Sequence, residues 1–151
     1  MPEQTWVLAG LGCVAVLALA LAGAVAIRRR LVVVEVVGDS MSPTYSSGDR
    51  LLVRRTRRVR AGDVVIAQHQ QDDRRDLRTG PLTTTWLVKR LVALPGDAVP
   101  ESVTAAAGGQ RSVPDGMAVL LGEDPASADS RTWGFVPLAD IAGVVVSRLG
   151  S

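Results

Sequence analysis

The sequence predicts a mainly β protein, an antiparallel all-β domain preceded by one N-terminal transmembrane helix. Three observations predict it. An uncharged apolar run lies near the N-terminus, short β-branched stretches alternate with turn-forming separators after it, and no convincing amphipathic helix lies between those stretches. We therefore divide the 151 residues into an anchor with its flanks, residues 1–30, and a β domain, residues 31–151.

The anchor is predicted from residues 5–27, which carry no charged side chain and are mostly apolar. A helix rises about 1.5 Å per residue, and about 20 residues cross the core of a bilayer. Trp6 lies at one end, where interfacial aromatic residues are favoured, and Arg28 to Arg30 end the other. A cleaved signal peptide is the alternative, but the leading MPEQ has no Lys or Arg. We therefore expect a single-pass membrane protein.

Six stretches after the anchor are predicted to be strands, because they are rich in β-branched residues with a period of two. They are residues 31–37, 50–59, 63–70, 84–94, 118–122 and 141–149. The separators between them are rich in Gly, Pro, Asp and Ser, which favour turns. Aromatic residues make up only 3% of the chain, so the core is expected to be aliphatic.

Composition excludes several classes of function. Cys13 is the single cysteine and His69 the single histidine, so an intramolecular disulfide, a Cys metal cluster and a multi-His metal site are excluded. No glycine motif for a phosphate loop or a dinucleotide appears. The formal charge of +2 is too small to predict a nucleic-acid partner. Six arginines between residues 50 and 60 form either a solvated strand face or a surface close to anionic lipid headgroups.

A candidate nucleophile lies in the segment GDSMSPT, residues 38–44, between the first two predicted strands. A plain turn needs Gly, Asp, Ser or Pro and has no need of a methionine. The alternative is that the sharp turn presents Ser40 for reaction, which requires a base. His69 lies in the polar stretch QHQQDDRR and is expected to be a surface residue, because a base should be partly desolvated.

A candidate base is Lys89, the single lysine beside 16 arginines. Arginine cannot lose its proton in a protein, whereas a buried lysine can. Strand alternation places Lys89 on one face with Leu87 and Leu91, where a desolvated neutral amine can accept the Ser40 proton. A lysine at a strand edge that reaches water is the alternative, and this residue alone does not decide between them.

A polar stretch near the C-terminus offers support for the lysine. If residues 127–131 are extended, Ser127, Asp129 and Arg131 point to one side of the chain. Asp129 and Arg131 can then pair, while Ser127 can hold the lysine amine by a hydrogen bond. A polar turn without a catalytic part is the alternative.

Together these segments resemble the type I signal peptidases, which are serine proteases with a Ser-Lys dyad. VVGDSMSPTYSSGDRLLV resembles their nucleophile box and WLVKRLVALPGDAV their base-bearing box. RAGDVVIAQ resembles the Gly-Asp strand between them, and LGEDPASADSRTWGFVPLADIAGVVV resembles the last box. Four boxes in order behind an anchor make the resemblance specific.

The resemblance implies roles for the candidate residues. Ser40 is the nucleophile, Lys89 the general base and Ser127 the serine that orients the lysine. Asp129 and Arg131 are a supporting pair. The Ser40 backbone N–H contributes to the oxyanion hole. Gly38 occupies the position at which some relatives carry a hydroxyl donor, and Met41 and Pro43 are expected to contact the substrate or the lipid surface.

The resemblance also implies a function, removal of N-terminal signal peptides from secreted precursors by cutting after small residues, without a cofactor or metal. The catalytic domain is expected outside the cytoplasm, although Arg28 to Arg30 after the helix favour the opposite orientation. One alternative is a dedicated maturation protease of the same family that acts on one precursor. An alternative of another class is a non-catalytic, membrane-anchored β binding domain.

Overall fold

The computed structural model describes residues 15–23, 25, 30–68 and 86–150. The chain divides into two units, residues 1–32 and residues 33–151. Residues 15–23 of the first unit are helical. Within the described part of the chain, no helix is both long enough and apolar enough to cross a membrane. Trp6, Cys13 and much of the predicted anchor lie outside the described residues, as does His69.

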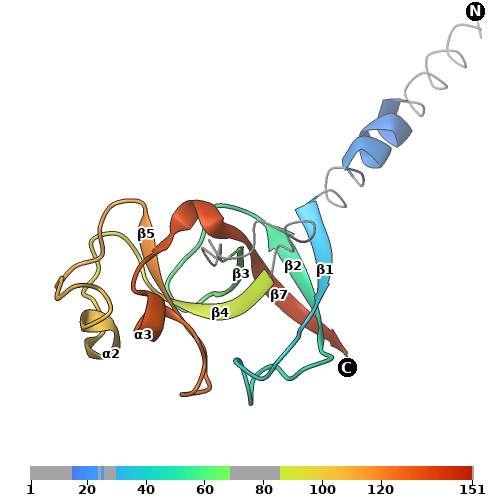
Figure 1. Ribbon diagram of the computed structural model, residues 1–151. Coiled ribbons are helices and arrows are strands. Elements are labelled where there is room, and N and C mark those ends of the chain that lie inside the picture. The colour runs from blue at the N-terminus through green and yellow to red at the C-terminus, as the bar shows by residue number, and fades with distance from the viewer. Residues whose placement is uncertain (1–14, 24, 26–29, 69–85, 151) are drawn as a thin grey trace, which may run out of the picture. The chain divides into compact units, whose positions relative to one another are not determined.

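One seven-stranded sheet dominates the second unit, with the strand order β1-β2-β7-β3-β4-β5-β6 (Figure 1). The strands are β1 (Leu31–Glu35), β2 (Arg50–Arg55), β3 (Val64–Gln68), β4 (Trp86–Ala93), β5 (Met117–Leu121), β6 (Val136–Pro137) and β7 (Ile141–Gly150). The pairings of β2 with β7, β7 with β3, β3 with β4, β4 with β5 and β5 with β6 are all antiparallel. The predicted antiparallel, mainly β architecture is therefore confirmed.

Three short helical turns were not predicted. They are α2 (Glu101–Thr104), α3 (Ser130–Trp133) and the 3₁₀ turn η1 (Leu138–Asp140). Each has no more than four residues, too few for an amphipathic period to be visible in the sequence. Their stability comes from packing rather than from helix propensity, since such short helices do not form alone.

The sheet curves around aliphatic side chains, as the scarcity of aromatic residues predicts. One cluster on the sheet includes Val65, Leu91 and Leu120, and a second includes Leu51 and Val53, all at most 1% exposed. Complete burial of each such side chain contributes about 1.5–3 kcal/mol relative to exposure. These two clusters fix the register of the central strands, because a slip of one residue would turn their apolar side chains outward.

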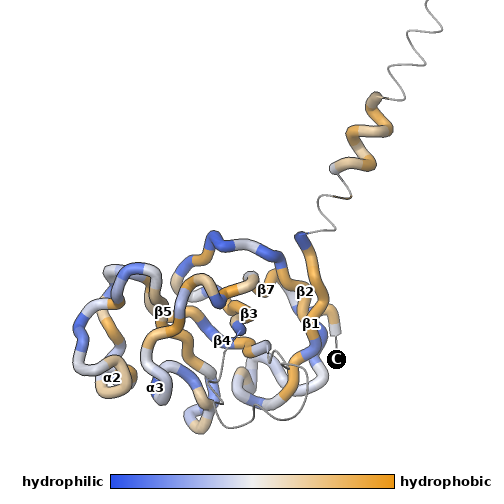
Figure 2. The backbone as a smooth tube through the Cα atoms, turned by 45° about the horizontal axis from the view of Figure 1, so that its top comes forward, coloured by the Kyte–Doolittle hydropathy of each residue, from blue (hydrophilic) through white to orange (hydrophobic). Residues whose placement is uncertain are grey.

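The link between β2 and β3, residues 56–63, crosses over β7. Both strands pair antiparallel with β7 from opposite sides, so they run parallel to each other. Because Arg55 pairs with Gly143 and Val65 with Val144, the link joins two strand ends that lie at nearly the same level of β7. Val59 packs against the cluster that contains Val65 and Leu91, while Arg58 and Arg60 on either side of it are exposed. Figure 2 shows this link as a mostly hydrophilic arc.

Candidate active site

The turn that carries Ser40 follows β1 and is closed by its own backbone. The Ser42 N–H donates to the Asp39 carbonyl at 2.9 Å, and the Tyr45 N–H donates to the Met41 carbonyl at 2.8 Å. Gly38 enters the turn with φ of +88°, in the left-handed region that disfavours a side chain. This conformation gives a physical reason for glycine at position 38.

Met41 does not lie at the surface. Its side chain is 0% exposed and packs in the core cluster with Val36, Leu51, Val53 and Val88. The expectation that Met41 contacts substrate or lipid is therefore wrong, because a completely buried side chain can reach neither. The methionine instead anchors the turn in the core, while Pro43 two residues later is exposed.

Lys89 lies on β4 and is buried, with 2% of the residue exposed. Its Nζ donates a hydrogen bond to Ser127 Oγ at 2.5 Å, as the sequence predicts. The alternative in which the amine reaches water is therefore wrong. Burial lowers the pKa of Lys89 below its ordinary value; Asp129 and Asp124 oppose this shift, and Arg131 adds to it. The neutral amine that a general base requires is thereby favoured.

The segment that supports Lys89 is not extended throughout. Asp129 has extended backbone angles but caps α3, which begins at Ser130, so the expected extended run to Arg131 is wrong. The physical reason is that an aspartate at this position accepts the first free N–H of a helix, here that of Arg131 at 3.0 Å. The cap also keeps Asp129 and Arg131 together.

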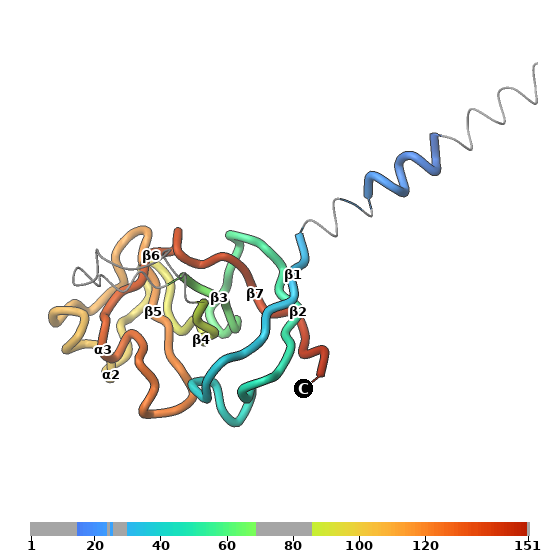
Figure 3. The backbone as a smooth tube through the Cα atoms, turned by 45° about the vertical axis from the view of Figure 1, so that its right-hand side comes forward, coloured from blue at the N-terminus to red at the C-terminus, as the bar shows by residue number. Residues whose placement is uncertain are grey.

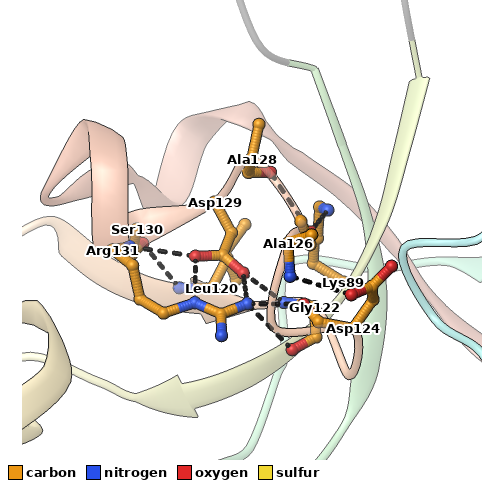
Figure 4. Close-up of polar contacts among 10 residues, drawn as sticks. Lys89, Leu120, Gly122, Asp124, Ala126, Ala128, Asp129, Ser130 and Arg131 are labelled. Carbon is orange, nitrogen blue, oxygen red and sulfur yellow. Dashed lines mark hydrogen bonds and ion pairs between the residues drawn. The ribbon is translucent and has the colours of Figure 1, made fainter.

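The predicted pair of Asp129 and Arg131 is confirmed (Figure 4). Arg131 Nε and Nη2 donate to the two carboxylate oxygens of Asp129 at 2.9 and 2.6 Å. The Gly122 N–H donates to the same carboxylate at 2.7 Å. Asp129 is completely buried, which alone would raise its pKa, but the hydrogen bonds from Arg131 and Gly122 outweigh burial and lower it.

One segment brings the Ser40 turn close to the lysine. The N–H groups of Glu123 and Asp124 both donate to the Ser40 carbonyl, at 2.8 and 3.2 Å. A Cβ added to Gly122 would lie 2.6 Å from that carbonyl and would also collide with the side chain of Ser127. Ser40, Gly122 and Ser127 are therefore neighbours, and Ser127 is in turn bonded to Lys89. Ser40 and Lys89 are both in the described part of the chain, and no hydrogen bond joins their side chains there.

Sequence reasoning did not single out Gly122, Glu123 or Arg90. Arg90 forms an ion pair with Glu123 and donates to the Gly62 carbonyl at 3.0 Å. Burial raises the pKa of Glu123, but hydrogen bonds from Thr44 and Arg90 outweigh it and lower the pKa overall. These contacts join segments far apart in the sequence, so no local pattern signals them. Within the described residues, no group of three or more His, Cys, Asp or Glu is arranged to hold a metal ion.

Comparisons with known proteins identify relatives of this chain. Residues 8–102 and 100–149 match the model of the family described as signal peptidase, peptidase S26. The chain is 31% identical over 119 residues to mitochondrial inner membrane protease subunit 1 of Schizosaccharomyces pombe, covering 74% of this chain and 69% of that protein. A solved signal peptidase I from Enterococcus faecalis V583 aligns with 22% identity and a TM-score of 0.41, over 59% of this chain and 97% of that one. The chain belongs to the signal peptidase family, peptidase S26.

Proposed function

We propose that this chain is a membrane-bound serine endopeptidase that removes N-terminal signal peptides from precursor proteins, with Ser40 as nucleophile and Lys89 as general base. One observation carries the proposal. The buried Lys89 amine is bonded to Ser127, on the same segment whose backbone holds the Ser40 carbonyl. A plain structural lysine would have no need of burial with a lowered pKa beside a turn that presents a serine.

The chemistry follows from these positions. The neutral Lys89 amine takes the Ser40 hydroxyl proton as the oxygen attacks the scissile carbonyl carbon, and a tetrahedral oxyanion forms. The Ser40 backbone N–H stabilises this oxyanion. The protonated lysine then gives its proton to the leaving amine, which leaves an ester on Ser40. Lys89 next takes a proton from a water molecule that attacks the ester, and the acid product is released as Ser40 regains its proton.

Ser127 and the Asp129–Arg131 pair act through Lys89. The Ser127 hydroxyl fixes the direction of the amine by its hydrogen bond. Asp129 holds Gly122 and Arg131, and Arg131 Nη2 also donates to the Asp124 carbonyl at 2.8 Å, so the segment keeps its shape. Both effects position the base without contact with the substrate.

The proposed substrate class and cellular location are carried over from the family. A membrane anchor and an extracytoplasmic catalytic domain suit precursors that emerge from a membrane, and the yeast relative is named as an inner membrane protease. We expect the substrate to bind in an extended conformation, paired with the edge of a strand. A shallow site would then accept small side chains before the scissile bond. A dedicated protease for one precursor would show the same chemistry on a narrower set of substrates.

The test is cleavage of a peptide that carries an Ala-x-Ala site by the full chain in detergent. Ser40→Ala and Lys89→Arg should each abolish cleavage, and the second keeps the positive charge while removing the base. The controls Ser112→Ala and Arg111→Lys change an exposed serine and an exposed arginine and should retain activity. Near-native activity of Lys89→Arg would refute the dyad.

Binding without catalysis predicts a different result. A serine-directed electrophile should add its mass to Ser40 in the native chain and leave Ser40→Ala unmodified. A chain that binds precursors but neither cleaves them nor reacts at Ser40 would support the non-catalytic β binding domain. A panel of precursors, of which only one is cut, would identify a dedicated maturation protease.

A further inference from the structure

An exposed cationic surface lies at the end of β2 and along the link that follows it. Its five arginines are all exposed and form no ion pair within the described residues. We name them the arginine surface: Arg54, Arg55, Arg57, Arg58 and Arg60. No acidic residue occurs between positions 50 and 62, so their charge is not neutralised locally.

The positive charge of this surface is exceptional within its unit. Residues 31–151 contain 14 basic and 14 acidic residues, because 3 of the 17 basic residues and 1 of the 15 acidic residues precede position 31. A neutral unit has no general attraction to polyanions, whereas five arginines within seven positions create a strong local field. Val59 packs the link against the core, whereas Arg58 and Arg60 beside it are exposed.

The surface lies at a particular end of the sheet. The Val36 N–H donates to the Asp49 carbonyl and the Gly48 N–H to the Val36 carbonyl, both at 2.9 Å, so β1 and β2 are joined as a hairpin. The first residues of β1 and the last residues of β2 therefore lie at the same end of the hairpin, as Figure 3 shows. In the sequence, β1 directly follows residues 1–30, the predicted anchor with its flanks.

We infer that the arginine surface binds the anionic headgroups of the bilayer in which the chain is anchored, and so orients the catalytic unit on the membrane. Guanidinium groups pair with phosphate in a bidentate manner and remain charged at any physiological pH. Basic residues close to an anionic leaflet are attracted to it, and the attraction falls off within a Debye length.

Docking would also limit how far the Ser40 turn lies from the membrane. Seven positions separate Ser40 from Val33, the first residue of the unit, and an extended chain spans at most about 3.4 Å per residue. Ser40 would then remain within about 24 Å of Val33, at the end of the hairpin that the docked arginine surface holds near the membrane. This inference rests on the membrane anchor of the proposed function but not on catalysis.

The experiment uses the full chain in vesicles, with Cys13→Ala so that one introduced cysteine carries a fluorophore. The label is placed at the exposed Ala61 by Ala61→Cys, beside Arg60, and a second preparation uses Gln110→Cys at an exposed tip away from the surface. A nitroxide on a headgroup of the vesicle quenches the fluorophore where the two are close. Vesicles of phosphatidylcholine alone are compared with vesicles that also contain phosphatidylglycerol.

We expect phosphatidylglycerol to increase quenching at position 61 and to leave position 110 unchanged. Raising the salt to 1 M, where the Debye length is about 3 Å, should reverse the effect. Replacing Arg55, Arg57 and Arg58 by Gln should lower the ratio of docked to undocked molecules about 100-fold, since each basic residue near the surface contributes about fivefold.

Two control variants separate an effect of the arginine surface from a general loss of charge or of catalysis. Arg111→Gln removes an exposed arginine outside the arginine surface and should not change quenching at position 61. Ser40→Ala should dock normally, which separates this test from failure of the proposed catalysis. Equal quenching in both kinds of vesicle, or an equal loss in Arg111→Gln, would overturn the inference. The inference would also be overturned if phosphatidylglycerol did not change the quenching at position 61 but an added precursor protected the label there, because the surface would then bind protein.

Discussion

A single methyl group at Gly122 should disable the enzyme while leaving most of its stability. In Gly122→Ala the new Cβ would lie 2.6 Å from the Ser40 carbonyl oxygen, whereas ordinary contacts begin at 3.4 Å. Relief of this contact therefore requires the Ser40 carbonyl and residue 122 to separate by about 0.8 Å, and Ser127 Oγ, 2.3 Å from the new Cβ, must move away by about 1.1 Å. Overpacking of this kind costs on the order of 1–3 kcal/mol of the free energy of unfolding. A misplacement of about 1 Å at a catalytic group can cost about 100-fold in rate.

The assay compares kcat for peptide cleavage with the midpoint of thermal unfolding for each variant. Gly143→Ala is the matched control, because its Cβ would lie 2.6 Å from the Arg54 carbonyl, between β2 and β7 and outside the candidate site. Both variants should lose similar stability, but Gly122→Ala alone should lose about 100-fold in kcat per folded molecule. If folded Gly122→Ala keeps its kcat within about threefold, the close approach of Ser40, Gly122 and Ser127 does not position the reacting groups.

Two further substitutions test the charges at the site. Lys89→Met should be inactive yet melt at a higher temperature than the native chain near pH 7, because it removes a buried cation. The folded pKa of Lys89 lies below its ordinary 10.5, so the destabilisation is full below the folded pKa and disappears as the pH rises toward 10.5. A lower melting temperature of Lys89→Met at pH 7 would contradict a desolvated amine. Asp129→Asn should cost about 3 kcal/mol, because it leaves Arg131, only 26% exposed, without its carboxylate. Since the pKa of Asp129 is lowered, this stabilisation is present above pH 4 and is lost as the pH falls through the folded pKa, so urea unfolding of the two proteins should converge in acid. Constant separation at all pH values would argue against the ionised pair.

Local patterns predicted the strands well, because alternation and turn residues act over a few positions. All six predicted stretches contain a strand, and Lys89 is buried on the face that alternation assigned to it. The predicted boundaries are too long at several ends; β2 ends at Arg55 rather than at residue 59, for example. At Arg55 the chain stops pairing with β7, and the sequence of β2 alone does not indicate where its partner strand is lost.

The supporting contacts of the site could be predicted only in part. Chemical complementarity allowed the bond from Lys89 to Ser127 and the pair of Asp129 and Arg131, and the family resemblance favoured them over a plain polar turn. The burial of Met41 did not, because a turn residue can point inward or outward and only the packing of β2, β3 and β4 decides. The need for glycine at position 122 depends on two segments that meet it from far along the chain, so no spacing rule reveals it.

The segment that begins at Gly122 gives two remote parts of the chain a common attachment. Its backbone binds the Ser40 carbonyl through Glu123 and Asp124, and Ser127 binds the Lys89 amine. The Ser40 turn and the Lys89 amine are bound to the same short segment, so a thermal displacement of that segment moves both in the same direction. Their separation therefore varies less than it would if each were bound to a different segment. Insertions at distant tips such as residues 105–110 should therefore leave the spacing between proton donor and acceptor unchanged. Tolerance of the scaffold to change and strictness of the reacting geometry can thus coexist in one small domain.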